Sequence, residues 1–243
     1  MRAMAFAGRN LREILRDPLS AVFGVLFPLG LLAVMQTLFR SIPGMPEVFL
    51  IQSFGPSMVV FGQTFLMMFL ATLTTADRSG AYLSRLFTTP MRSADFLCGY
   101  SLAIFPLAVL QAALCLGLAA AFGMNLGGNL PAILGVLLAD ALLFVSLGLL
   151  FGCAFQSVQL VSGMCSLVIN LAAWLSGMWF PLDLVGGGFR AVCQLLPFYH
   201  AVQAMKCAAS GASPLSSLIW VLGYAAVIAV AAALLFRRRM RGE

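Results

Sequence analysis

Residues 130–154 read LPAILGVLLADALLFVSLGLLFGCA, and this stretch decides the fold class because Asp140 is its only charged residue. A helix of about 20 apolar residues is long enough to cross the roughly 30 Å hydrocarbon core of a bilayer. The whole chain has the same character, since 62% of its 243 residues are hydrophobic and only 9% are charged. Soluble domains carry roughly 25% charged residues. The stretch therefore predicts a membrane-spanning helix in a membrane protein.

Further apolar blocks of similar length lie before and after this stretch. Each block is bordered by glycine, proline or a charged residue. The six predicted spans cover residues 19–39, 54–76, 97–122, 130–154, 159–180 and 215–236. The first block is too long for the core of a cleaved signal peptide, so we expect it to remain as a helix. The sequence predicts an all-α integral membrane protein with one transmembrane domain over residues 1–243.

Basic residues are distributed unevenly between the two sides of these spans. One side carries Arg2, Arg9, Arg12, Arg16, Arg78, Arg85, Arg92, Arg237, Arg238, Arg239 and Arg241. The other side carries only Arg40, Arg190 and Lys206. Because basic residues concentrate on the cytoplasmic side, both termini are predicted to be cytoplasmic in a multi-pass protein of the cell (inner) membrane. Contacts with membrane lipid explain the net charge of +6, and no nucleic-acid partner is expected.

The segment 1–17 is predicted to form an amphipathic helix at the membrane surface. Its arginines fall within an arc of roughly 80° when the residues are placed at 100° intervals. They are Arg2, Arg9, Arg12 and Arg16, and the opposite face carries Met4, Ala7, Leu11, Ile14 and Leu15. Such a helix lies among the lipid headgroups instead of crossing the bilayer. The alternative is a frayed tail in which the arginines are scattered by chance.

The longest cytoplasmic connection, residues 77–96, is too polar to enter lipid but carries an apolar stripe. The stripe consists of Tyr82, Leu83, Leu86 and Phe87, and Pro90 is expected to end the helix that bears it. Two interpretations remain open. The stripe either folds back against its own bundle or docks into a groove of another protein.

The outer segment 181–212 contains two half-apolar stretches around Pro181, three consecutive glycines and Pro197. Each stretch is too short to span the membrane. We therefore expect re-entrant outer helices before the last span, shielded by protein or lining a water-filled cavity. No internal repeat relates the two halves of the chain, which argues against an inverted-repeat secondary transporter.

Asp140 is the most informative polar residue within the spans, because an unpaired carboxylate near the bilayer centre costs several kcal/mol. Gln63, Gln111 and Asn170 also lie inside spans and are candidate partners. Asp140 either forms a structural hydrogen bond to a neighbouring helix or lines a substrate path that favours a cationic or amphipathic compound. Gly148 and Gly152 form a small-xxx-small pair suited to close helix packing.

The chain shows no pattern of residues for catalysis. A phosphate-binding loop needs G-x-x-x-x-G-K-S/T, whereas the only lysine, Lys206, lies in QAMKC. The single histidine, His200, is expected to be a packing residue. The six cysteines lack metal-ligand spacing, so no metal site is expected. Free thiols are the default expectation, and a Cys193–Cys207 disulfide remains open.

Three strings carry a resemblance to a known family: GAYLSRLFTTP (residues 80–90), SGMWFP (176–181) and LPFYHAVQAMK (196–206). They resemble the permeases of ABC type-2 transporters. The resemblance implies a dimer with an identical or a different permease, and a separate ATPase subunit that binds ATP and Mg. It implies a coupling helix formed by Arg78, Gly80, Tyr82, Leu83, Arg85, Leu86, Phe87 and Pro90, and a smaller second contact near residues 155–159. Its re-entrant segment would include Pro181, Pro197, His200 and Lys206.

The resemblance also implies that the chain is not itself an enzyme but exports a compound. We expect a small amphipathic drug or antibiotic, as in multidrug resistance, or a lipid, moved out of the cytoplasm or the inner leaflet. The alternatives are a stand-alone secondary carrier or channel, or a polysaccharide-exporting permease of the same type. Family members commonly carry acidic residues around the first loop helix. Here Ser79, Ala81 and Ser84 are uncharged, so the sequence departs from the family pattern at these positions.

Overall fold

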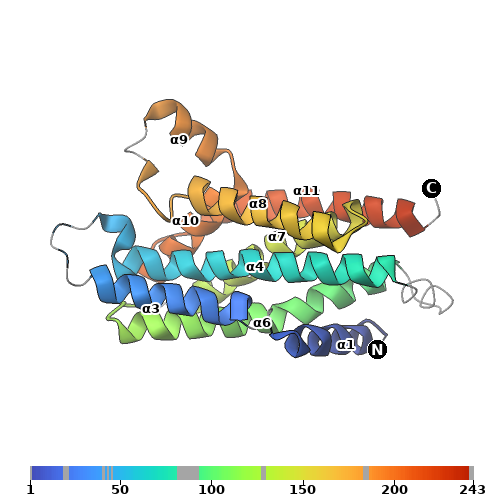
Figure 1. The fold of residues 1–243 in the computed structure, drawn as a ribbon. Coiled ribbons are helices and arrows are strands. Elements are labelled where there is room, and N and C mark those ends of the chain that lie inside the picture. The colour runs from blue at the N-terminus through green and yellow to red at the C-terminus, as the bar shows by residue number, and fades with distance from the viewer. Residues whose placement is uncertain are drawn as a thin grey trace.

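The computed structural model describes residues 2–18, 22–39, 42, 44, 46–80, 93–126, 130–182 and 186–240. Within these ranges the chain forms helices and no β-strand (Figure 1). The helices are α1 (Arg2–Arg16), η1 (Val22–Leu26), α3 (Phe27–Phe39), η2 (Glu47–Phe49), α4 (Ile51–Ser79), α6 (Ser93–Ala121), α7 (Leu130–Ala154), α8 (Val158–Leu175), α9 (Gly187–Gln194), α10 (Pro197–Ser210) and α11 (Leu215–Met240).

Six of these segments are long and apolar enough to cross a membrane, which confirms the predicted all-α membrane fold. They cover Val22–Phe39, Ile51–Ser79, Asp95–Ala121, Leu130–Ala154, Val158–Leu175 and Leu215–Arg238. The first of them joins a short π-helical turn, η1, to α3. Both termini and the end of α4 lie at one end of the bundle, and α9, the end of α3 and the start of α4 lie at the other (Figure 1).

Helices α4 and α7 form the centre of the bundle, and most of the hydrophobic window of each is buried. Helix α4 packs against α6, α7, α8 and α10, while α7 also packs against α11. By contrast, α3, α8 and α11 leave most of their surface uncovered. Because these uncovered faces are apolar, lipid or a second membrane protein is their natural environment.

Two glycines allow α4 and α7 to approach closely, as the small-xxx-small spacing predicts. A Cβ added at Gly148 would lie 2.7 Å from the carbonyl oxygen of Met67, and one at Gly152 would lie 2.7 Å from Cβ of Thr74. Both contacts advance along the two helices in the same direction, so α4 and α7 run parallel. Any larger side chain at these positions would push the helices apart.

Helix α1 packs against α6 at the end of the bundle that holds the termini. Its inward face consists of Phe6, Ala7, Asn10 and Ile14, which are buried. Met4 and Leu15, assigned by the helical wheel to the apolar face, are exposed. The inward face is therefore narrower than the wheel indicates, because α6 covers only part of the helix. The placement of α1 among headgroups stays a prediction.

The segment before the last span forms two short helices, α9 and α10. Pro197 opens α10, where its missing N–H group has no helical partner to lose, and Gly211 closes it with a φ of 79°. Helix α10 packs against α4, α7 and α11, and its residues Ala201, Ala204 and Ala208 are buried. The re-entry of α9 and α10 into the membrane stays a prediction.

Candidate functional site

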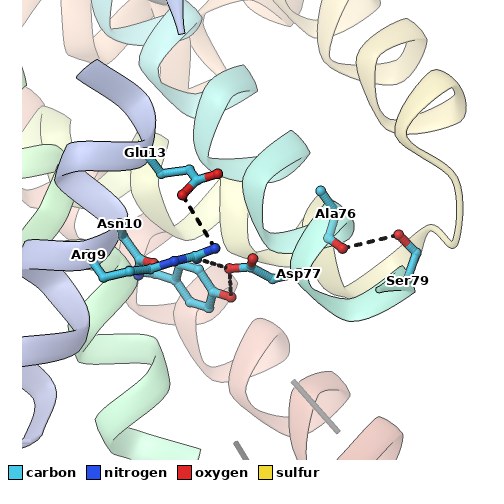
Figure 2. A network of polar contacts seen from close by, with 7 residues as sticks. Arg9, Asn10, Glu13, Ala76, Asp77 and Ser79 are labelled. Atoms are coloured by element: carbon cyan, nitrogen blue, oxygen red, sulfur yellow. Dashed lines mark hydrogen bonds and ion pairs between the residues drawn. The ribbon is translucent and has the colours of Figure 1, made fainter. Parts of the chain in front are cut away.

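A polar junction joins three helices at the end of the bundle that holds the termini. The carboxylate of Asp77, in the last turns of α4, accepts a hydrogen bond of 2.7 Å from the guanidinium of Arg9 in α1 (Figure 2). The same Oδ2 atom accepts a hydrogen bond of 2.8 Å from the hydroxyl of Tyr100 in α6. We call Arg9, Asp77 and Tyr100 the Asp77 junction. It fixes the end of α4 to both α1 and α6.

Aromatic packing positions α1 so that Arg9 can reach Asp77. The ring of Phe6 packs edge to face against Phe96 at 5.4 Å and against Tyr100 at 4.9 Å. Asp77 is 6% exposed, so its charge is largely removed from water and needs the compensation that Arg9 provides. Glu13 also approaches Arg9, at 3.6 Å, but its side chain is 55% exposed and the pair contributes little.

Arg78, one residue further along α4, contacts the end of α7. Its guanidinium donates hydrogen bonds to the carbonyl oxygens of Gly152 and Phe155. The last carbonyls of a helix lack partners within the helix, and a cation there also favours the helix dipole. A polar cleft of about 310 Å³ lies at this place, lined by Thr75, Arg78, Ser79, Phe155 and Gln156.

Only the first of the residues expected to form the coupling helix, up to Gly80, lie in the described part of the chain. Asp77, Arg78 and Ser79 belong to α4, and Gly80 caps that helix, so these residues are an extension of the span. The other expected coupling residues lie outside the described residues: Tyr82, Leu83, Arg85, Leu86, Phe87 and Pro90. The docking stripe therefore stays a prediction, while the described residues show what it is attached to.

A second feature is a large apolar cavity of about 830 Å³ between η1, α3, α4 and α8. Its walls are mainly aromatic, with Phe27 and Phe65 packed edge to face at 5.6 Å. The other lining residues are Phe23, Phe61, Met68, Ser166, Ile169, Asn170, Ala173, Trp174, Trp179 and Phe180. Asn170 therefore faces this cavity, and its amide donates a hydrogen bond to the carbonyl of Ser166.

Asp140 is completely buried in α7, and neither carboxylate oxygen has a hydrogen-bond partner among the described residues. Gln63 is also buried, and both polar atoms of its amide lack partners within the same part of the chain. Gln111 donates to the carbonyl of Met58 and to the sulfur of Cys115. The expected hydrogen bond from Asp140 to Gln63, Gln111 or Asn170 does not form in this structure.

The outer segment places its candidate residues in different environments. His200 is buried and stacks on Trp220, with ring centroids 5.1 Å apart, and its Nε2 is 2.8 Å from the carbonyl oxygen of Gln194. Burial lowers the pKa of His200, and the Gln194 contact opposes this shift. These contacts fit the expected packing role. Pro197 is buried at the start of α10, and Pro181 and Lys206 both line a second hollow.

The described residues show neither a metal-binding cluster nor a disulfide bond. Within those ranges, no three His, Cys, Asp or Glu side chains lie close enough to share an ion. All six cysteines lie in the described part of the chain, and each is a free thiol there, including Cys193 and Cys207.

Sequence reasoning missed the roles of Asp77 and Tyr100. Arg9 and Asp77 are separated by 68 positions, so no local spacing connects them. A weak signal existed, because Asp77 is an acidic residue at the very end of an apolar block, where a buried carboxylate needs a cation.

Comparison with known proteins gives one family. The model of the family described as ABC-2 type transporter matches residues 2–207, which is most of the chain. A comparison with curated proteins found no significant match.

Proposed function

The chain belongs to the family of ABC-2 type transporters, and on this basis we propose that it is the membrane permease of an ATP-driven exporter for small amphipathic compounds. The family domain is a membrane transport unit, and such permeases work with an ATP-binding subunit. The multi-pass architecture agrees with that role. The direction of transport, the type of substrate and the route by which ATP acts are the content of the proposal.

The aromatic cavity is the observation that carries the choice of substrate. Its volume of about 830 Å³ lies within the range of roughly 300–1,000 Å³ that is usual for small-molecule pockets. Phenylalanine and tryptophan walls suit apolar ring systems and bind organic cations through their faces. Asn170 and Ser166 supply polar groups on one wall, from α8. An amphipathic compound would place its apolar rings against the aromatic walls and its polar group beside Asn170 and Ser166.

Asp140 supports a preference for positively charged compounds. A carboxylate buried at this depth without a partner among the described residues costs several kcal/mol. Such a cost is unusual for a residue that serves packing alone. We infer that Asp140 contributes to transport and acquires a partner in another conformation of the bundle.

The end of α4 is the proposed entry point for the energy of ATP. A nucleotide-driven movement can bias transport only if it acts differently on two arrangements of the bundle. The segment expected to dock on the ATPase follows Gly80 directly, and α4 is tied there to α1, α6 and α7 through Asp77 and Arg78. A push on this segment would therefore act on four helices together.

The exposed apolar face of α8 supports assembly with a second permease. Leu160, Leu167, Leu171 and Trp174 are all exposed there, and Trp174 also lines the aromatic cavity. A second permease packed on this face would close the cavity from the side.

Co-purification tests the proposed docking directly. The tagged chain is co-expressed with an ABC ATPase, which we expect a neighbouring reading frame to encode, and purified in mild detergent, and the bound ATPase is quantified. We expect Leu86→Asp and Phe87→Asp to reduce the bound ATPase by at least tenfold, because each places a charge in an apolar groove. Ser84→Asp is the matched control, since it adds the same charge off the predicted stripe. Equal recovery with all three variants would remove the stripe from the interface.

A further inference from the structure

A second hollow, of about 590 Å³, lies at the end of the bundle opposite the termini. Five segments line it: η2, the start of α4, the connection after α8, and helices α9 and α10. Its lining residues are Pro46, Glu47, Val48, Ser53, Gly177, Pro181, Leu182, Arg190, Tyr199, Gln203 and Lys206. None of them lines the aromatic cavity, so this outer hollow is a separate feature.

Helix α10 turns a polar face toward the outer hollow. Tyr199, Gln203 and Lys206 all line the hollow, and their spacing of four and then three residues places them on one side of a helix. The alanines on the other side of α10 are buried in the bundle. The packing of α10 therefore fixes the backbone positions from which these three side chains reach the hollow.

The charge of the outer hollow is predominantly positive among the described residues. Lys206 comes from α10 and Arg190 from α9, and Glu47 of η2 is the one carboxylate among the described lining residues. Within the described part of the chain, no carboxylate lies within ion-pair distance of the Lys206 amine. Partial burial lowers the pKa of Lys206 to about 8, which reflects the cost of holding its charge away from water.

We propose that the outer hollow binds a small oxyanion, of phosphate or carboxylate type, on Lys206 and Arg190. An oxyanion would supply the negative charge that a partly buried ammonium lacks, and the Tyr199 hydroxyl and Gln203 amide are additional donors on the same face. The anion comes either from solution or from the headgroup of an acidic lipid. This site goes beyond the proposed export function, because it lies outside the aromatic cavity and needs no ATPase.

Lys206 can report on its own site because it is the only lysine in the chain. An uncharged amine-reactive ester modifies only Lys206 and the N-terminal amine, and peptide mass spectrometry separates the two products. The full chain in phosphatidylcholine nanodiscs is treated from about pH 6 to about pH 10, with and without inorganic phosphate. A parallel series uses nanodiscs that contain phosphatidylglycerol.

The expected result follows from the protonation of the amine, because only the neutral amine reacts. Without an added anion, the rate at Lys206 should rise with a midpoint near pH 8. A bound anion stabilises the ammonium, so it should slow modification by roughly tenfold at neutral pH and move the midpoint upward. The N-terminal amine reports the general surface potential of phosphatidylglycerol, so protection at Lys206 counts only where it exceeds the slowing at the N-terminal amine.

The two anion sources give distinct outcomes. Protection by free phosphate in phosphatidylcholine identifies a soluble anion, whereas protection only with phosphatidylglycerol identifies a lipid headgroup. A Lys206 rate that neither source changes overturns the proposal. A failure of ATP-driven export would leave these rates untouched, so the two proposals fail independently.

Two variants should change the protection of Lys206 in opposite directions while leaving Lys206 itself in place. Arg190→Gln removes a positive charge and should weaken protection. Glu47→Gln removes the opposing carboxylate from an exposed position and should strengthen protection. If both variants protect Lys206 as the wild type does, the charges of the hollow do not hold the anion and the site is wrongly placed.

Discussion

Asp77 carries an unusual share of the contacts at the end of the bundle that holds the termini. One oxygen atom of its carboxylate receives hydrogen bonds from Arg9 and from Tyr100, so the residue links α1, α4 and α6. Its neighbour Arg78 adds α7 through helix-end carbonyls. Displacement of α4 can therefore reach α1 through the Arg9 contact, α6 through Tyr100 and α7 through Arg78.

The first prediction concerns this contact. Arg9→Met or Asp77→Asn should each lower the stability of the purified protein by about 1–3 kcal/mol, because each leaves one charge of the pair without its partner. Thermal unfolding in detergent measures the loss. Glu13→Gln is the control, since its exposed contact with Arg9 should be worth less than about 0.5 kcal/mol. If the Arg9→Met, Asp77→Asn double variant loses the full sum of both single losses, the two residues are not coupled.

Asp140 gives the second prediction. Asp140→Asn keeps the shape of the side chain and removes the buried charge, so the protein should be at least as stable as the wild type. Export should nevertheless fall by roughly tenfold or more, because the carboxylate that we infer to gain a partner in another conformation of the bundle is lost. Export by whole cells, normalised to the amount of protein in the membrane, tests both effects. Unchanged export at normal membrane levels would leave Asp140 with a structural role only.

The sequence indicates that Arg9 and Asp140 need partners, but it does not indicate which residues those partners are. Asp140 drew attention because a carboxylate in an apolar stretch is costly wherever its neighbours lie. The partner of Arg9 could not be predicted, since the helical wheel treats a helix alone and Asp77 lies 68 positions away. The amides expected to pair with Asp140 share only its approximate depth in the membrane. Depth in the membrane does not determine the direction in which a side chain points.

Among the helices, α7 shows how a short spacing rule controls packing. Gly148 and Gly152 face α4, and the carbonyl of Met67 lies where a Cβ at Gly148 would need space. The rule works from sequence because four residues span about one helical turn, so both glycines must share a face. It does not say which helix they meet, and the structure identifies that helix as α4.

The third prediction follows from this contact. Gly148→Ala should destabilise the protein by about 1–3 kcal/mol, because the added methyl group meets rigid backbone. Gly135→Ala, in the same helix, is the matched control, since a Cβ there has nothing within 4 Å. Thermal unfolding of both variants gives the comparison. Equal melting temperatures would show that α4 and α7 are less closely packed than described.

The outer helices mark the limit of prediction from sequence. Spans are recognisable because each must match the bilayer by its own length and composition. The alanines of α10 give no comparable signal, because a small residue can face lipid or a neighbouring helix. Only the structure shows that α10 packs against α4, α7 and α11, with its polar side facing the outer hollow.

Across the molecule, the uneven distribution of arginine predicts how the bundle is oriented. Figure 1 places both termini and the end of α4 at one end, so the basic residues of these described segments can face the cytoplasm together. The fourth prediction is that a cysteine at Ser213, which is exposed between α10 and α11, reacts with a membrane-impermeant thiol reagent in intact cells. A cysteine at Gln156, exposed at the opposite end, should react only after the cells are permeabilised. The wild-type chain corrects for the native cysteines, and the reverse pattern would invert the topology.

The source of energy distinguishes an ATP-driven permease from a stand-alone carrier. Inside-out membrane vesicles containing the chain and its ATPase are supplied with amphipathic fluorescent cations, and accumulation is followed under two conditions. One contains ATP with an uncoupler, and the other contains a proton gradient without ATP. We predict chain-dependent accumulation with ATP and the uncoupler, and its loss in the Leu86→Asp variant. Accumulation driven by the proton gradient without ATP would contradict the assignment and identify a secondary carrier.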